Sequence, residues 1–337
     1  MKNSFIFFLG VAAGLLSGQV PFLDTVHPVT ANSLIGFDTL NGGYVTAVAP
    51  AVDVSTYQYA RFDHNGALTD TLLLSYPPGY FFNGCTRCIK VRPEAIYDAY
   101  TQFWRIDSVS VMLNKVSRDL RDTLQSREIF LDAVPNFFST GTEIYELEFD
   151  SDSTFLLGGM TAIFDSLCNP LVGKKLAVVA RFDTALNLLW HKTIKPVTAP
   201  CDNSGYSASA IIIDSYGSFV VTGNTPWYNR DGKAFMARLR LSDGKLLWKK
   251  EFDNFPRGAW GMYAADNLDG TYRFVRNDIF DDNFGANRIT MGIMDTAGNV
   301  LKTNRFKKLR NNQDESIFVH DFIRTHDGHY YAIGHSG

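Results

Sequence analysis

Apolar and polar residues alternate along much of the chain in short runs, and small polar turns separate the runs. In the clearest stretch, the runs follow one another at Ser207–Asp214, Ser218–Gly223, Ala234–Leu241 and Lys245–Phe252. Alternation with a period of two is typical of β-strands, and the Asp243-Gly244 pair between the last two runs is a strong hairpin signal. The pattern therefore predicts four antiparallel strands joined in sequence.

The third run of this unit carries a phrase that recurs along the chain: an apolar residue, Ala, Arg, a second apolar residue and, in most copies, Asp. Copies are found at Tyr59–Asp63, Val179–Asp183 and Met236–Leu239, with weaker ones at Met291–Asp295 and Val111–Asn114. An aromatic-rich phrase ending near Gly precedes most copies. Its aromatic residues are 64, 53 and 58 residues apart at Phe155, Phe219, Tyr272 and Tyr330. Such a period indicates a repeated unit with variable loops.

A four-stranded antiparallel unit repeated in this way is the plan of a β-propeller blade. Neighbouring blades must cover each other's apolar faces, which explains why the same phrase recurs. We therefore predict an all-β chain that forms a β-propeller of about five full blades plus a C-terminal half-blade. The blades are expected at about residues 33–76, 95–130, 143–195, 207–252 and 260–307, with the partial blade at 316–337.

The second of these blades has an alternative interpretation. Leu113, Val116, Leu120 and Leu124 also fit the apolar stripe of an amphipathic helix. The register of the repeat favours strands here.

A half-blade leaves open sheet edges, which proteins usually avoid. We therefore expect either a natural chain that continues past Gly337 or a closing strand within residues 19–32.

The stretch LSDGKLLWKK at Leu241–Lys250 resembles the Gly-Lys-x-Leu-Trp phrase of pyrroloquinoline-quinone-type propeller repeats. The Asp-Gly-x-Tyr phrases resemble those of exported bacterial β-propeller repeat proteins, and the resemblance covers Ser33–Gly337. The resemblance to the pyrroloquinoline-quinone-type phrase implies that Trp190 and Trp248 each dock their own blade on its neighbour. Active quinoproteins need a cofactor site with acidic and aromatic residues and calcium, and no such set stands out, so we expect no cofactor.

The N-terminus has the form of an export signal. Lys2 precedes the apolar run Phe5–Leu16, and Ser17-Gly18 offers small residues for cleavage. The run is too short to span a bilayer comfortably, and no later stretch is long and apolar enough for a membrane helix. We predict a signal peptide at residues 1–18, a linker or closing strand at 19–32, and a protein that is secreted or displayed at the cell surface.

The strand pattern predicts long loops at Pro77–Pro93, Ala162–Lys174, Lys195–Tyr206, Asn224–Lys233 and Asn277–Asn287, and all four cysteines fall in these loops. In an exported chain, Cys85, Cys88, Cys168 and Cys201 predict disulfide bonds, with the pairs Cys85–Cys88 and Cys168–Cys201 favoured among three connectivities. Two alternatives stay open. The Cys-x-x-Cys spacing also occurs in zinc sites and in redox motifs.

The same long loops, which share one face of a propeller, carry aromatic residues suited to binding a protein or a carbohydrate. The alternative is that these side chains fold inward and cap the blade core. The candidate ligand-binding residues are Tyr80, Phe81, Phe82, Trp227, Tyr228, Phe280 and Phe284.

Charge and the remaining clusters narrow the function further. The net charge is −3 and no basic stripe is present, so nucleic acid is not expected as a partner. Asp278, Asp281, Asp282 and Asn283 are interpreted as a solvated acidic loop rather than a calcium site. We predict no metal site and no catalytic residue among the histidines His320, His326, His329 and His335. The sequence thus favours a non-catalytic binding or scaffold module. A propeller enzyme, quinone-dependent or acting on glycans, and a purely structural repeat of a longer surface protein are the alternatives.

Overall fold

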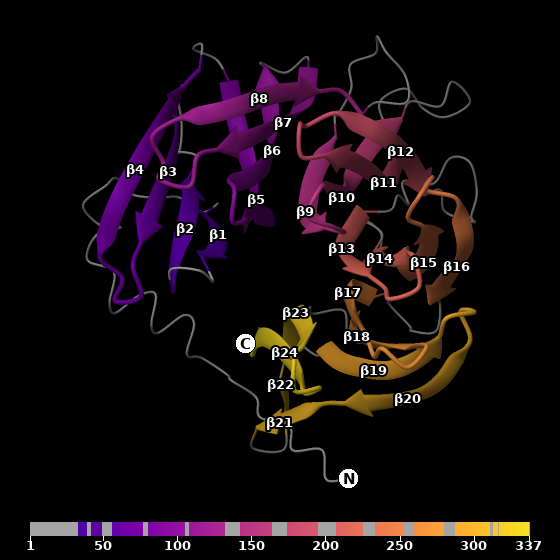
Figure 1. The fold of residues 1–337 in the computed structure, drawn as a ribbon. Coiled ribbons are helices and arrows are strands. Elements are labelled where there is room, and N and C mark those ends of the chain that lie inside the picture. The colour runs from indigo at the N-terminus through magenta and orange to yellow at the C-terminus, as the bar shows by residue number, and fades with distance from the viewer. Residues whose placement is uncertain are drawn as a thin grey trace. The chain divides into compact units, whose positions relative to one another are not determined.

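The computed structural model of the chain describes thirteen stretches, and their secondary structure is entirely β (Figure 1). These stretches are residues 33–38, 42–48, 56–76, 80–104, 108–131, 142–163, 174–194, 207–224, 233–252, 259–279, 287–310, 313–315 and 317–336. Across them, no helix has the length and hydropathy that crossing a bilayer would require. The chain divides into two compact units, residues 16–202 and residues 203–337 together with 1–15.

The first unit contains three four-stranded antiparallel sheets, each with its strands in chain order. Blade 1 consists of β1 (Ser33–Asp38), β2 (Gly43–Val48), β3 (Thr56–Phe62) and β4 (Leu68–Ser75). Blade 2 consists of β5 (Tyr80–Val91), β6 (Ile96–Trp104), β7 (Ser108–Val116) and β8 (Thr123–Ile129). Blade 3 consists of β9 (Glu143–Phe149), β10 (Thr154–Ile163), β11 (Lys174–Asp183) and β12 (Leu188–Ile194).

The second unit contains two sheets of the same kind and a partial one. Blade 4 consists of β13 (Ser207–Ile213), β14 (Ser218–Asn224), β15 (Ala234–Arg240) and β16 (Leu246–Phe252). Blade 5 consists of β17 (Ala259–Asp266), β18 (Thr271–Ile279), β19 (Asn287–Asp295) and β20 (Val300–Phe306). A short hairpin and a half-blade follow, formed by β21 (Lys308–Arg310) with β22 (Gln313–Glu315) and by β23 (Ile317–Arg324) with β24 (Tyr330–Ser336).

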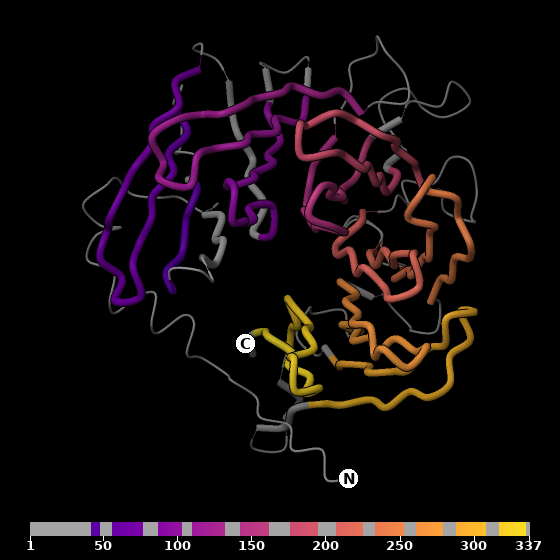
Figure 2. Tube along the Cα trace, viewed as in Figure 1, coloured from indigo at the N-terminus to yellow at the C-terminus, as the bar shows by residue number. Residues whose placement is uncertain are grey.

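Within each unit, the first strands of successive blades lie next to one another: β1 contacts β5 and β5 contacts β9, while β13 contacts β17 and β17 contacts β23. Figure 2 follows the chain through these sheets, from indigo at the N-terminal side to yellow at the C-terminal side. Apolar clusters fill the space between neighbouring blades. One of them joins Tyr97 and Leu113 of blade 2 to Phe155 and Phe182 of blade 3. Stacked blades therefore bury each other's faces, as the recurring phrase requires.

The recurring phrase occupies the third strand of every blade, in a fixed register. The pairing of third and fourth strands shifts by one residue at the same place in all five blades, directly after Arg61, Lys115, Arg181, Arg238 and Ile293. Blade 2 therefore has its copy of the phrase two residues later than predicted, at Leu113–Ser117. Its β7 and β8 are strands, so the helical alternative for this stretch is wrong.

The predicted long loop at Pro77–Pro93 is a further correction. Most of it forms β5, and Tyr80, Phe81 and Phe82 are paired there with Trp104, Phe103 and Gln102 of β6. Blade 2 therefore begins near residue 80 rather than near residue 95. Three consecutive aromatic residues favour an extended strand, and the Pro-Pro-Gly stretch before them only marks where that strand starts.

Candidate functional site

Only part of the predicted ligand-binding set is described by the structure. Tyr80, Phe81 and Phe82 lie on strand β5 rather than in a loop, and their side chains are not among the described ones. The other four candidates fall outside the described residues: Trp227, Tyr228, Phe280 and Phe284. For these four residues, the structure shows which strands lie on either side of the connection that contains them.

The two ends of each blade differ in the length of their connections. Because consecutive strands are antiparallel, the first-to-second and third-to-fourth turns share one edge of a sheet, and the other connections share the opposite edge. In blades 3 and 4 the first-to-second and third-to-fourth turns are short and span residues 150–153, 184–187, 214–217 and 241–245. The connections at the opposite edge are longer and span residues 164–173, 195–206 and 225–233. We call the edge that carries these longer connections the loop edge. Trp227, Tyr228, Cys168 and Cys201 all belong to loop-edge connections.

Cys88 is fully buried in the core between blades 2 and 3 and is disulfide-bonded. It lies in a segment of β5 where the pairing with β6 is interrupted, between Gly84 and Ile89. Cys85 is in the same segment. Cys168 and Cys201 fall outside the described residues, so the connectivity stays a prediction.

On the opposite edge, each third-to-fourth turn in blades 1, 3 and 5 is closed by the Asp that ends the recurring phrase. The Asp63 carboxylate accepts the backbone N–H groups of Asn65 (2.8 Å) and Ala67 (2.9 Å). Asp183 and Asp295 accept the N–H groups two and four residues further on in the same way. Hydrogen bonding from the Ala67 N–H holds the pKa of Asp63 below its ordinary value. This Asp is therefore a turn-closing residue.

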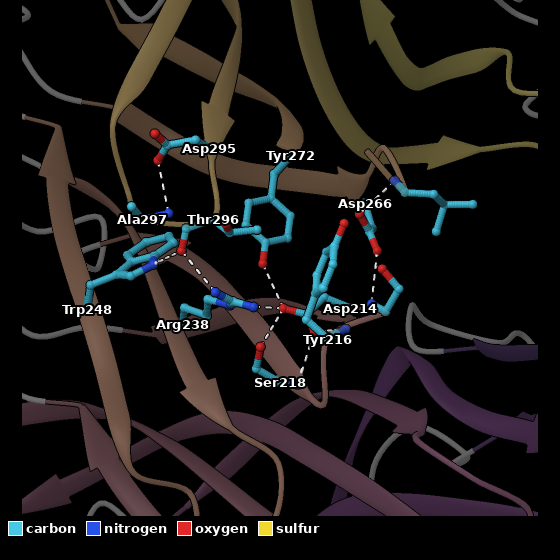
Figure 3. Close-up of polar contacts among 12 residues, drawn as sticks. Asp214, Tyr216, Ser218, Arg238, Trp248, Asp266, Tyr272, Asp295, Thr296 and Ala297 are labelled. Atoms are coloured by element: carbon cyan, nitrogen blue, oxygen red, sulfur yellow. Dashed lines mark hydrogen bonds and ion pairs between the residues drawn. The ribbon is translucent and has the colours of Figure 1, made fainter. Parts of the chain in front are cut away.

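A buried carboxylate, Asp214, connects blades 4 and 5 (Figure 3). It accepts hydrogen bonds from the Ser218 hydroxyl (2.6 Å), the Arg238 Nε (3.0 Å) and, from blade 5, the Tyr272 hydroxyl (2.7 Å). Burial alone raises the pKa of Asp214, but the hydroxyl groups of Ser218 and Tyr272 and the backbone N–H groups of Tyr216 and Ser218 outweigh it and hold the pKa below its ordinary value. In blade 3, Arg181 pairs in the same way with Asp150 at 2.5 Å.

The backbone carbonyl of Thr296, directly after the turn-closing Asp295 of blade 5, is the second contact between these blades. It accepts hydrogen bonds from Arg238 Nη1 (2.9 Å) and from Trp248 Nε1 (2.8 Å), as Figure 3 shows. The indole ring also contacts Gly298, where an added Cβ would lie 3.0 Å from it. Trp248 is thus packed and hydrogen-bonded onto the next blade.

The first unit repeats this contact between blades 2 and 3. Lys115, at the position of Arg238, donates to the carbonyl of Thr184 at 3.2 Å. Gln125 and Arg127 of β8 donate to the carbonyls of Ala185 and Leu186 in the same turn. Trp190 is paired with Arg181 across the third and fourth strands of blade 3, just as Trp248 is paired with Arg238 in blade 4.

A row of charged side chains joins the first strands of blades 2 and 3. Arg87 of β5 is 3.0 Å from Glu146 of β9, and Lys90 is 2.6 Å from Glu148. Glu146 is 3% exposed, and burial raises its pKa to about 7 although Arg87 and Lys90 oppose the shift. The sequence patterns gave no sign of this row, because its members are separated by 58 to 59 residues and match no motif.

The acidic and histidine clusters do not form metal sites in the part of the chain described. Asp278 is fully buried and paired with Arg276 (2.6 Å), which corrects its assignment to a solvated acidic loop. Asp281, Asp282 and Asn283 lie outside the described residues. His326 and His329 are exposed at the β23–β24 turn. The described residues contain no group of three His, Cys, Asp or Glu side chains placed to hold a metal ion.

Several solved structures are similar in fold. A neuraminidase-like protein of A/little yellow-shouldered bat/Guatemala/060/2010 is 11% identical, with a TM-score of 0.44 over 73% of this chain and 76% of its own. BamB from Moraxella catarrhalis is 8% identical, with a TM-score of 0.39 over 86% and 78%. The quinohemoprotein alcohol dehydrogenase ADHIIG from Pseudomonas putida HK5 is 12% identical, with a TM-score of 0.47 over 80% and 41%. No family model and no curated protein sequence matches the chain.

The predicted fold class is confirmed. The chain is an all-β protein of the β-propeller type, with five four-stranded antiparallel blades and a two-stranded partial blade in its described residues. This likeness concerns the fold alone, so any function has to be argued from the residues themselves.

Proposed function

We propose that the chain is an exported, non-catalytic β-propeller module that binds a protein or carbohydrate partner at its loop edge. The observation that supports this is the different construction of the two edges of a blade. At the short-turn edge, polar groups are used to close turns and to join blades, as with Asp63 and the Thr296 carbonyl. The loop edge carries the longer connections, and rigid scaffolds usually present their binding residues on such loops.

Trp227 and Tyr228 are the residues on which we base the test. They lie in the connection between β14 and β15, whose flanking strand β14 is buried along its whole length. A rigid strand leading into an aromatic loop suits a binding site, because aromatic rings supply large contact areas at little cost in side-chain entropy. The sugar faces of a glycan and the apolar anchors of a protein both fit such rings.

The experiment is a glycan array probed with the full chain, in which Trp227→Ala and Tyr228→Ala are compared with the native protein. We expect each variant to lose at least about tenfold in affinity, since truncating an aromatic anchor at the centre of a site costs about 2 kcal/mol or more. Tyr216→Ala is the matched control. Tyr216 is an exposed aromatic residue at the opposite edge, in the β13–β14 turn, and its removal should leave binding unchanged.

Equal binding by the two loop variants and the native chain would contradict the loop-edge proposal, as would a loss confined to Tyr216→Ala. A native chain that retains no glycan would contradict the carbohydrate partner. The protein partner is then tested by a photo-cross-linking residue at position 228, with position 216 as the control.

A catalytic function is the second candidate, and Glu146 is the observation that favours it. A buried carboxyl group with a pKa near 7 beside a guanidinium group is suited to general acid–base chemistry. Turnover of glycoside substrates by the native chain, lost in Glu146→Gln and kept in Glu148→Gln, would establish this function. Native protein without turnover on such a panel would contradict it.

A further inference from the structure

A second buried carboxyl group, Asp98, lies between blades 1 and 2. It is on β6 and only 1% exposed. The Tyr59 hydroxyl of β3 donates a hydrogen bond to Asp98 Oδ2 across the contact between the blades, at 2.8 Å. Asn114 of β7 donates to the same hydroxyl at 3.0 Å and itself accepts from Ser126 of β8 at 2.7 Å. Asp98 is thus hydrogen-bonded directly to the neighbouring blade.

The surroundings of Asp98 are aromatic and apolar. Tyr57 of β3 and Tyr100 of β6 are stacked with ring centroids 4.3 Å apart, within a cluster that includes Val45 and Ile89. The cluster is formed by side chains from both blades. A charge that develops on Asp98 is therefore shielded from water on both sides.

The titratable groups that face Asp98 from the packed strands are tyrosines: Tyr57 and Tyr59 on β3, Tyr76 after β4, and Tyr100 on β6. The pKa of each is raised by burial, so all four stay neutral near pH 7. β7 contributes the neutral Asn114.

Among the described residues, Asp98 has no ion pair. The nearest cation along β3, Arg61, has its guanidinium group 3.9 Å from Asp70 instead. Asp214 also accepts a hydrogen bond from a tyrosine hydroxyl of a neighbouring blade, but it has in addition the Ser218 hydroxyl at 2.6 Å and the Arg238 guanidinium at 3.0 Å. Within the described part of the chain, Asp98 has neither of these further donors.

We propose that Asp98 is a pH-sensitive link between blades 1 and 2: its neutral carboxyl group holds the blades together, and its ionisation loosens blade 1. The physical reason is that a buried carboxylate without a cation is strongly disfavoured, whereas its protonated form can be accommodated. Blade 1 is the part released, because the side chains that cover Asp98 from across the contact, Tyr57 and Tyr59, both belong to β3.

The direction of the pH effect follows from the pKa. Burial raises the pKa of Asp98 to about 7, and the hydrogen bond from Tyr59 opposes the rise only in part. The closed contact binds the proton more tightly than the opened one, in which the pKa is near its ordinary value of 3.8. Its extra stability is complete below the ordinary value and is lost as the pH rises through 7. Between pH 6 and pH 8 the closed population relative to the open one falls about tenfold.

The experiment is hydrogen exchange of the full chain at pH 6 and pH 8, corrected for the intrinsic exchange rates and read on the amides of β3 and β4. We expect protection in these strands to fall about tenfold in the native chain and to stay constant in Asp98→Asn, which keeps a neutral side chain at both pH values. Asp70→Asn, which removes an exposed carboxyl of β4, should keep the native response. Glu146→Gln should also keep it in β3, because Glu146 joins blades 2 and 3.

A tenfold fall that persists in Asp98→Asn would overturn the proposal, as would constant protection in the native chain. If the variant does not fold, carboxyl carbon NMR of the native chain labelled at aspartate decides the matter. One aspartate that titrates between pH 6 and pH 8 supports the proposal, and none in that interval overturns it.

Discussion

Asp98 and Asp214 are both buried, and both accept a hydrogen bond from a tyrosine hydroxyl of a neighbouring blade. Their pKa values nevertheless move in opposite directions, up for Asp98 and down for Asp214. At the residue scale, the number of hydrogen-bond donors decides which form of a buried carboxyl is stable: besides the Tyr272 hydroxyl, Asp214 accepts from the Ser218 hydroxyl and from the backbone N–H groups of Tyr216 and Ser218. The turn-closing aspartates reach the same ionised state at the surface by accepting backbone N–H groups.

Asp214→Ala tests this assignment. Removing the carboxylate leaves Arg238 partly buried without its partner, so we expect the free energy of unfolding to fall by about 3 kcal/mol at pH 7. Because the folded pKa is lowered, this stabilisation is present above the ordinary value and is lost as the pH falls below it. Urea titrations at pH 7 and pH 3 measure both effects. The same deficit at both pH values would contradict the ionised pair, and Asp70→Ala serves as the exposed control.

At the scale of the single strand, the glycine that ends the aromatic-rich phrase has a steric cause. An added Cβ at Gly223 would lie 1.9 Å from the Ser207 carbonyl oxygen of β13, and Gly159 and Gly334 are as close to β9 and β23. In each case the first strand bulges at this point and brings its backbone against the second. The fourth strands bulge too, and the inserted residue is an exposed leucine in four blades: Leu124, Leu189, Leu247 and Leu301.

Gly223→Ala is therefore expected to lower the free energy of unfolding by about 2 kcal/mol, since the clash is with rigid backbone rather than with a flexible side chain. Gly217→Asn is the matched control. Gly217 has a φ of 70° and nothing within 4 Å of an added Cβ, and Asn tolerates this backbone conformation. Thermal unfolding of both variants provides the comparison. A larger loss at Gly217 than at Gly223 would show that backbone conformation matters more than the close approach.

For the molecule as a whole, neighbouring blades within a unit are joined by donors of one blade that converge on a turn of the next. Arg238 and Trp248 donate to one carbonyl oxygen, that of Thr296, and Lys115 reaches the equivalent Thr184. Because the repeat places these contacts alike between blades 2 and 3 and between blades 4 and 5, the blades of each pair depend on one another for their polar groups as well as for their core.

A double-mutant cycle with Trp248→Phe and Arg238→Met measures this dependence. Each single change leaves one donor on the Thr296 carbonyl, and the double change leaves none, so the combined loss should exceed the sum of the single losses by about 1 kcal/mol. Denaturant unfolding of the four proteins gives the coupling. Strictly additive losses would contradict a shared acceptor.

The sequence by itself determined the strand order, the repeat and the blade plan, because alternation and turn residues act locally. It also marked the turn-closing aspartates, whose partners are two to four residues away. The first strand of blade 2 was missed, since Tyr80–Phe82 follow a Pro-Pro-Gly stretch that looks like a loop. Only the tertiary structure decided which buried acids are paired. Asp98 meets Tyr59 across 39 residues and Glu146 meets Arg87 across 59, and the charge state of a buried group depends on neighbours that only the stacking of blades brings together.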